Sequence, residues 1–188
     1  MTVINRFLSI MAWCDDQGAS RLFGWSGNPV PVEVSRPNLG SSVTSPYIFD
    51  RKIPASEEAC RALALYREAR TAQQSGFISY AVLNYYKIIE LRHPNNPKRW
   101  FRENFPPPDT DGGDLKMFNN LRGDTPPEDY IHKSCRIAVA HASPDSKSDP
   151  DEVDELQRLH LAADIMRMLA RRFVEKEFAI SDVMFSGD

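Results

Sequence analysis

Arg136 and His141 are the two residues of this chain whose types and spacing best suit a catalytic role. They lie in the stretch CRIAVAH, residues 135–141, where small and apolar side chains otherwise predict a buried helix. Histidine, with an ordinary pKa of about 6.5, exchanges protons at neutral pH. Arginine stays charged and holds a phosphate through two hydrogen bonds. The pair is therefore suited to metal-free RNA cleavage by 2′-hydroxyl attack, with His141 moving protons and Arg136 stabilising charge on the phosphate.

The spacing alone also fits two structural residues, because an arginine and a histidine five positions apart on a helix are common by chance. On a regular helix Arg136 points about 140° away from His141, so the two side chains do not lie side by side. They converge if the helix frays at His141, or if two copies of the helix meet across a two-fold axis. The second route needs no distortion and predicts a homodimer with both pairs in one cleft.

Two helices are predicted upstream of this segment. Ser56 is placed to cap a helix whose first turn carries Glu57 and Glu58. Ser75-Gly76 ends that helix, and a second one is predicted over about residues 77–92, where HPNNP stops it. Because the second helix is apolar on more than one side, we expect it to lie centrally in a bundle.

Two further helix starts are marked by their capping residues. Thr125, Pro126 and Glu128 form a capping box for the helix that carries CRIAVAH and ends near His141. The stretch SDPDE, residues 148–152, predicts a long last helix that reaches about Phe178. Its apolar residues recur three and four positions apart: Leu156, Leu159, Ala163, Met166, Ala170 and Phe173.

Residues 93–124 are predicted to be irregular. Within them KRWFREN is a basic and aromatic cluster that suits a short helix. Trp100 and Phe101 either pack inward from a solvated turn or contact an RNA backbone. Asp109, Asp111 and Asp114 resemble part of a calcium loop, but the distal glutamate is missing and we expect no calcium there.

Residues 1–50 are predicted to form a small antiparallel β element ahead of a helical domain at 54–180. RFLSIMAWC and SRLFGW read as strands joined by a turn at DDQG, and VPVEV and YIF read as short edge strands. No apolar run approaches the roughly 20 residues of a membrane span. The overall fold class predicted is therefore mostly α.

Composition points to an ordinary globular protein. The chain has 188 residues, a net charge of -3 and three cysteines. The charge gives no general attraction to nucleic acid, so any RNA site has to be local. The cysteines are scattered, which favours reduced thiols and a cytoplasmic location and argues against zinc. We expect no metal and no cofactor.

The motif and its surroundings resemble the HEPN superfamily. Its Arg-x4–6-His motif appears here as RIAVAH, and LYREARTAQQSGFISYAVLNYYKIIE is similar to the first two HEPN helices. Together with CRIAVAHA, that segment is similar to the methylamine-utilisation protein J family and its uncharacterised relatives. The resemblance covers roughly residues 55–178. It implies a bundle of four to five helices that forms a homodimer and cuts RNA without a metal through Arg136 and His141.

The resemblance also implies an alternative. Active members often carry Asn, Asp or His directly after the motif arginine, where this chain has Ile137. HEPN domains without activity serve as modules that dimerise or bind a nucleotide or a partner protein, and Ile137 favours that function. An antitoxin or another protein partner would fit the superfamily.

Three more residues are candidates for supporting roles. Glu90 either faces the cleft from the second helix or pairs with Lys87 or Arg92. Tyr130 and His132 lie near enough on the motif helix to join the site, or occupy the surface. The other histidines, His93 and His160, are expected to be structural or exposed.

Overall fold

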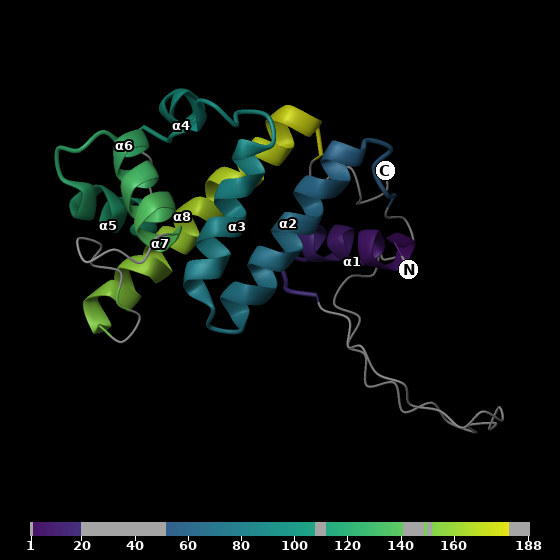
Figure 1. Cartoon of the computed structure of the whole chain (residues 1–188), viewed down its shortest axis with the longest axis horizontal. Coiled ribbons are helices and arrows are strands. Elements are labelled where there is room, and N and C mark those ends of the chain that lie inside the picture. Colours follow the sequence, from purple (N-terminus) through teal and green to yellow (C-terminus); the bar gives the residue numbers. More distant parts are fainter. Residues whose placement is uncertain (1, 20–51, 108–111, 141–148, 150–151, 181–188) are drawn as a thin grey trace, which may run out of the picture.

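The computed structural model describes residues 2–19, 52–107, 112–140, 149 and 152–180, and every regular element within these residues is helical (Figure 1). The mostly α fold class is thus confirmed. In chain order the elements are α1 (Thr2–Cys14), α2 (Glu57–Gln74), α3 (Ile78–Glu90), α4 (Pro97–Asn104), α5 (Gly113–Arg122), α6 (Pro127–Ile131), the π-helix η1 (His132–Ile137), α7 (Ala138–Ala140) and α8 (Val153–Phe178).

The helices α2 and α3 form the hairpin that the sequence predicted. The Ser56 hydroxyl accepts a hydrogen bond from the Ala59 amide at 3.3 Å, which caps α2 as expected. Gly76, at φ +81°, makes the turn between the two helices in a conformation that favours glycine. The helices α2 and α3 pack against each other, and alanines of α2, Ala62 and Ala69 among them, are buried in the core.

The long helix α8 packs along α3 and runs diagonally behind it in Figure 1. The predicted apolar stripe faces the core, except that Leu156 at the first turns is 37% exposed. Phe173 is fully buried, and its ring lies 5.2 Å from that of Trp100 and 6.0 Å from that of His93. This aromatic cluster joins the end of α8 to α4.

The predicted N-terminal strand RFLSIMAWC is wrong, because these residues belong to helix α1. The buried positions are Ser9, Ile10, Ala12 and Trp13, which recur at helical spacing and pack against α2. A short apolar run suits either element, and here the tertiary contact decides for the helix. The described residues contain no strand, and the other predicted strands lie outside them.

Arginines of two other helices donate hydrogen bonds to backbone carbonyls at the C-terminal end of α1. Arg70 of α2 donates to the Asp16 carbonyl through Nε at 3.0 Å and Nη2 at 2.6 Å. Arg171 of α8 donates to the Trp13 carbonyl at 3.2 Å. Cationic side chains stabilise a helix C-terminus because they satisfy carbonyls that have no partner within the helix.

The region predicted to be irregular, residues 93–124, contains two helices. In α4 the rings of Trp100 and Phe101 are buried, which confirms that they pack inward. The helix α5 was missed, because only Leu115 and Phe118 turn inward from it and its neighbours are rich in Gly and Asp. The predicted calcium-like loop lies partly outside the described residues.

The capping box predicted at Thr125 is also wrong. The helix α6 begins at Pro127, with Pro126 at its N-cap and no side-chain capping bond. Glu128 does not reach back to Thr125, because its buried carboxylate accepts from Arg102 Nε at 2.7 Å. The last helix likewise begins at Val153 after Glu152, without a side-chain cap.

The described helices include none that is long and apolar enough to cross a bilayer. The three cysteines are free thiols: Cys60 and Cys135 are buried and Cys14 is half-buried.

Phe173 tests how far the bundle depends on the contact between α8 and α4. Replacing it with alanine leaves a cavity among packed rings, so we expect the free energy of unfolding to fall by about 3–5 kcal/mol in urea denaturation. The matched control is Phe77→Ala, since Phe77 is 68% exposed; it should change stability by less than about 0.5 kcal/mol. Equal losses for both variants would contradict this packing.

Candidate functional site

The segment that carries the Arg-x4-His motif is not a regular α-helix. Residues His132–Ile137 form the π-helix η1 between α6 and α7. The predicted offset of about 140° between Arg136 and His141 assumed regular helical spacing, and that assumption fails in this segment. His141 lies outside the described residues. In a π-helix the hydrogen bonds join residues five apart, and such turns occur frequently at functional sites.

Burial of Cys135 fixes one side of η1. Its side chain is fully buried, and burial raises the pKa of the thiol to about 12. The thiol therefore stays protonated at neutral pH and serves as a small packing group. Ile131, at the end of α6, is also fully buried, so the irregular turn is anchored to the core through its inner face.

A buried ion pair on α8 supports the same turn from outside. Arg158 donates through Nη1 to the Ser134 carbonyl of η1 at 3.2 Å. Glu155 holds this guanidinium in a two-point contact, at 2.6 Å to Nε and 2.7 Å to Nη2. The side chains of Arg158 and Glu155 are only 18% and 9% exposed. The Ser134 carbonyl inside the irregular turn thus has a hydrogen-bond donor, Arg158, which Glu155 holds in position.

Arg136 is paired with Glu90 of α3. Its Nε lies 3.3 Å from Glu90 Oε1, and the two side chains are 35% and 29% exposed. The two alternative partners of Glu90 are engaged elsewhere: Lys87 donates to Asn84 Oδ1 at 3.1 Å, and Arg92 pairs with Glu58 at 3.2 Å. Glu90 therefore turns toward the motif segment, as one of its two predicted orientations required.

His132 is held by Tyr86, the residue one turn before Glu90 on α3. The Tyr86 hydroxyl lies 3.1 Å from His132 Nδ1, and Tyr86 is fully buried. Burial raises the pKa of Tyr86, so its hydroxyl keeps its proton. Burial, followed by the nearby cations Lys98 and Arg136, lowers the pKa of His132 below its usual value. In the Nε2–H tautomer of neutral His132, the hydroxyl is the donor of this hydrogen bond and Nδ1 the acceptor.

The structure thus brings together three of the predicted site residues, Glu90, His132 and Arg136, between α3 and η1. Tyr86 completes this cluster, which is called the Tyr86–Arg136 cluster below. Sequence reasoning missed Tyr86, although its position four residues before Glu90 places both on one face of a helix. The ring of Tyr130 packs edge-on against that of Phe118, with the ring centroids 5.2 Å apart.

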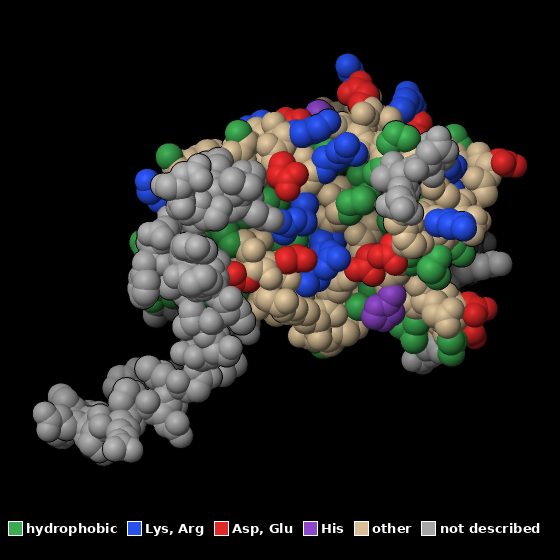
Figure 2. Space-filling model, turned by 180° about the vertical axis from the view of Figure 1, so that it is seen from behind, with side chains coloured by type: hydrophobic (Ala, Val, Ile, Leu, Met, Phe, Trp, Pro, Cys, Tyr) green, Lys and Arg blue, Asp and Glu red, His purple; other side chains and the backbone are tan. Residues whose placement is uncertain are grey.

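The charges around the cluster are nearly balanced. Arg136 is paired with Glu90, and Lys98, which also faces His132, is paired with Asp129 at 2.9 Å. The other two cations of α4, Arg99 and Arg102, each contact a glutamate as well. On the face drawn in Figure 2, acidic side chains likewise lie among the basic ones.

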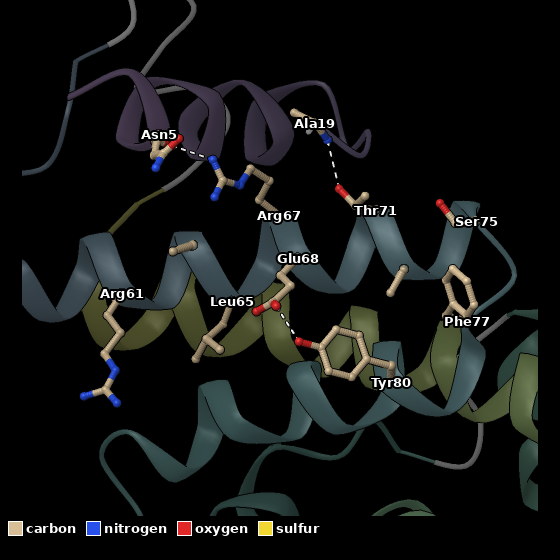
Figure 3. A pocket seen from close by; sticks show the side chains of 12 residues that line it. Asn5, Ala19, Arg61, Leu65, Arg67, Glu68, Thr71, Ser75, Phe77 and Tyr80 are labelled. Carbon is tan, nitrogen blue, oxygen red and sulfur yellow. Dashed lines mark hydrogen bonds between the residues drawn. The ribbon is translucent and has the colours of Figure 1, made fainter. Parts of the chain in front are cut away.

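The hollow drawn in Figure 3 lies away from this cluster, along the exposed side of α2. It encloses about 570 Å³ and is lined by α2, by Asn5 of α1, by Ala19 beyond that helix and by the start of α3. Ala19 donates to Thr71 Oγ1 at 3.1 Å at one wall, and Tyr80 contacts Glu68 at another. Neither Arg136 nor His132 lines this hollow.

Among the residues that the structure describes, no group of three or more His, Cys, Asp or Glu side chains is arranged to hold a metal ion. The side chains of the Tyr86–Arg136 cluster are instead suited to proton exchange and to anion binding.

A comparison with protein families gives one match: the family described as methylamine utilization protein MauJ, over residues 62–175. The matched span runs from α2 into α8 and includes every residue of the Tyr86–Arg136 cluster. No curated protein and no solved structure matches the chain.

The pair Glu155–Arg158 tests how the irregular turn is supported. In Arg158→Ala the buried Glu155 carboxylate loses the cation that neutralises it, so we expect the free energy of unfolding to fall by about 3–5 kcal/mol. The double variant Glu155→Leu/Arg158→Met removes both charges and should lose less. Denaturation curves followed by circular dichroism measure both losses, and an equal loss would mean that burial of an unpaired charge is not the cause.

Proposed function

The chain belongs to the methylamine utilization protein MauJ family, and from that premise we propose that it is a HEPN-like homodimer that cleaves RNA without a metal. In this proposal Arg136 and His141 carry the chemistry in a cleft shared by two copies. The family's description names methylamine use, whereas the side chains gathered between α3 and η1 are an acid–base and phosphate-binding set. RNA supplies both a phosphate and a hydroxyl proton for such a set.

The observation that carries the proposal is the Tyr86–Arg136 cluster itself. Four polar side chains from two elements converge at the Arg-x4-His segment, and that segment adopts a π-helix. Irregular helical turns of this kind are costly and are frequently retained at functional sites. A purely structural helix of small residues would have no need of this arrangement.

The roles in cleavage follow from the chemistry of each group. His141 accepts the proton of the 2′-hydroxyl, whose oxygen then attacks the adjacent phosphorus. Arg136, oriented by Glu90 at Nε, stabilises the extra negative charge on the phosphate oxygens with its terminal nitrogens. The 5′-oxygen leaves and takes a proton from the second histidine of the shared cleft. The products are a 2′,3′-cyclic phosphate and a 5′-hydroxyl. One histidine has gained a proton and the other has lost one.

Ile137 supports the homodimer. Its side chain is 46% exposed directly beside Arg136 on η1. A second copy packed against this surface would bury the isoleucine and remove water from the arginine, which strengthens charge stabilisation. The cleft would then contain one Arg136 and one His141 from each copy.

A second candidate function is a non-catalytic module that dimerises or binds a nucleotide or a partner protein. Ile137 favours it, because an apolar side chain stands where a polar one would orient the site. The ion pair of Arg136 with Glu90 also favours it, since a ligand phosphate has to compete with a carboxylate for the guanidinium. An antitoxin or another protein partner belongs to this candidate.

RNA cleavage in the presence of EDTA distinguishes the two functions. We expect the wild-type chain to cut single-stranded RNA to 2′,3′-cyclic phosphate ends, and His141→Ala and Arg136→Ala each to lower the rate by about 10²–10⁴-fold. The matched control is His160→Ala, because His160 is an exposed histidine of α8; it should keep the wild-type rate.

Circular dichroism of each variant separates lost chemistry from lost folding. Absence of cleavage by the wild-type chain on RNAs of varied sequence, with dimerisation intact, would reject the ribonuclease and support the module. Cleavage that survives both substitutions would show that another site, or a contaminant, cuts the RNA.

The shared cleft makes a separate prediction about oligomeric state. Ile137→Asp places a charge in the proposed interface, so we expect a dimer of the wild-type chain to become a monomer in light scattering. The control is Met117→Asp, since Met117 is another exposed apolar side chain, 59% exposed on α5. A wild-type monomer, or a dimer that tolerates Ile137→Asp, would contradict a cleft built at η1.

A further inference from the structure

His132 belongs to the Tyr86–Arg136 cluster but has no role in the cleavage steps described above. Its Nδ1 faces the Tyr86 hydroxyl at 3.1 Å, and Tyr86 comes from the buried side of α3 with no exposed surface. His132 itself is half-buried. The hydroxyl of this buried tyrosine forms its hydrogen bond with one ring nitrogen of His132, which restrains the orientation of the imidazole.

The position of the imidazole proton follows from that contact. The buried Tyr86 hydroxyl retains its proton because its pKa is raised, and at 3.1 Å it is placed to donate to Nδ1 when that nitrogen carries no proton. Neutral His132 then accepts at Nδ1 and carries its own proton at Nε2. The pKa of His132 is lowered first by burial and then by two cations, so this neutral form predominates at neutral pH.

The groups that face His132 come from four elements. Lys98 of α4 and Arg136 of η1 bring positive charge, while Asp129 of α6 and Glu90 of α3 bring negative charge. Each cation is already paired with one of these carboxylates. A neutral N–H donor beside a guanidinium adds a hydrogen bond to an anion without adding charge repulsion within the site.

We propose that His132 is a second hydrogen-bond donor of the phosphate site, with Arg136 as the charged donor and Tyr86 as the residue that positions the imidazole. The ligand class is a phosphate monoester or diester, such as one phosphate of an RNA strand. The inference deepens the proposed function, since it concerns the same site. It requires binding of a phosphate and does not require that RNA be cut.

Titration of the full chain with inorganic phosphate tests this role by nuclear magnetic resonance of the histidine ring nitrogens. At pH 7 and constant ionic strength we expect the His132 signals to shift and saturate, while those of His160 stay in place. Arg136→Gln and His132→Asn should each weaken phosphate binding about tenfold, the loss of one charge-assisted hydrogen bond. Repeating the titration with an oligonucleotide tests a phosphodiester in place of the free ion.

Tyr86→Phe tests the positioning role. It removes only a hydroxyl, and we expect the nitrogen shifts of His132 to change from the Nε2–H tautomer to a mixture of tautomers. A structural defect alone would lower thermal stability without this signature. If Tyr86→Phe does not fold, His132→Asn and its phosphate affinity carry the test.

The outcomes separate this inference from the ribonuclease. Saturable phosphate shifts at His132 without any RNA cleavage would uphold the inference and reject the ribonuclease. RNA cleavage that persists in His132→Asn, together with no phosphate shift at His132, would overturn the inference and leave the ribonuclease. Equal shifts at His132 and His160 would also overturn it, since they indicate a general response of the protein to the salt.

Discussion

The packing of α8 against α3 is the constraint on which the other elements depend. The two helices bury their apolar stripes against each other, and α8 then offers arginines to carbonyls of three other elements. Arg158 reaches Ser134 in η1, Arg171 reaches Trp13 in α1, and Arg172 reaches Asn104 at the end of α4 at 2.7 Å. One long helix thereby satisfies backbone groups that helix ends and irregular turns leave without a partner.

This arrangement explains why the candidate site lies where it does. The helix α3 presents two polar residues one turn apart, Tyr86 and Glu90, from a helix that is otherwise among the most buried of the bundle. The segment η1 faces them with His132 and Arg136. Cys135 anchors the turn to the core and Arg158 supports it from α8, so the side chains between are held from both sides.

The sequence predicted correctly those parts of the fold that depend on residues close together in the chain. The hairpin of α2 and α3 and the stripe of α8 could be predicted because caps, a Gly turn and apolar spacing agree over many residues. The strand predicted at RFLSIMAWC failed because nine residues do not distinguish the two periods, and packing on α2 chose the helix. The local sequence does not predict the π-turn, and the hydrogen bond to its Ser134 carbonyl comes from Arg158, which lies 24 positions further along the chain. The partner of Glu90 also depends on tertiary structure. Glu90 pairs with Arg136 of η1, and not with Lys87 or Arg92, which are close to it in sequence.

Two ion pairs of similar chemistry therefore have different consequences, and burial decides between them. Glu155 and Arg158 are largely shielded from water, so separating them exposes the core to an unpaired charge and the pair is fixed. Glu90 and Arg136 are each about a third exposed, at 29% and 35%, and solvent screening keeps such a pair weak. The Glu90 contact engages only Nε of Arg136, so in the proposed site a phosphate would meet the terminal nitrogens while Glu90 orients the arginine. The segment η1 carries a contact of each kind within three residues, a shielded one at Ser134 and a more exposed one at Arg136.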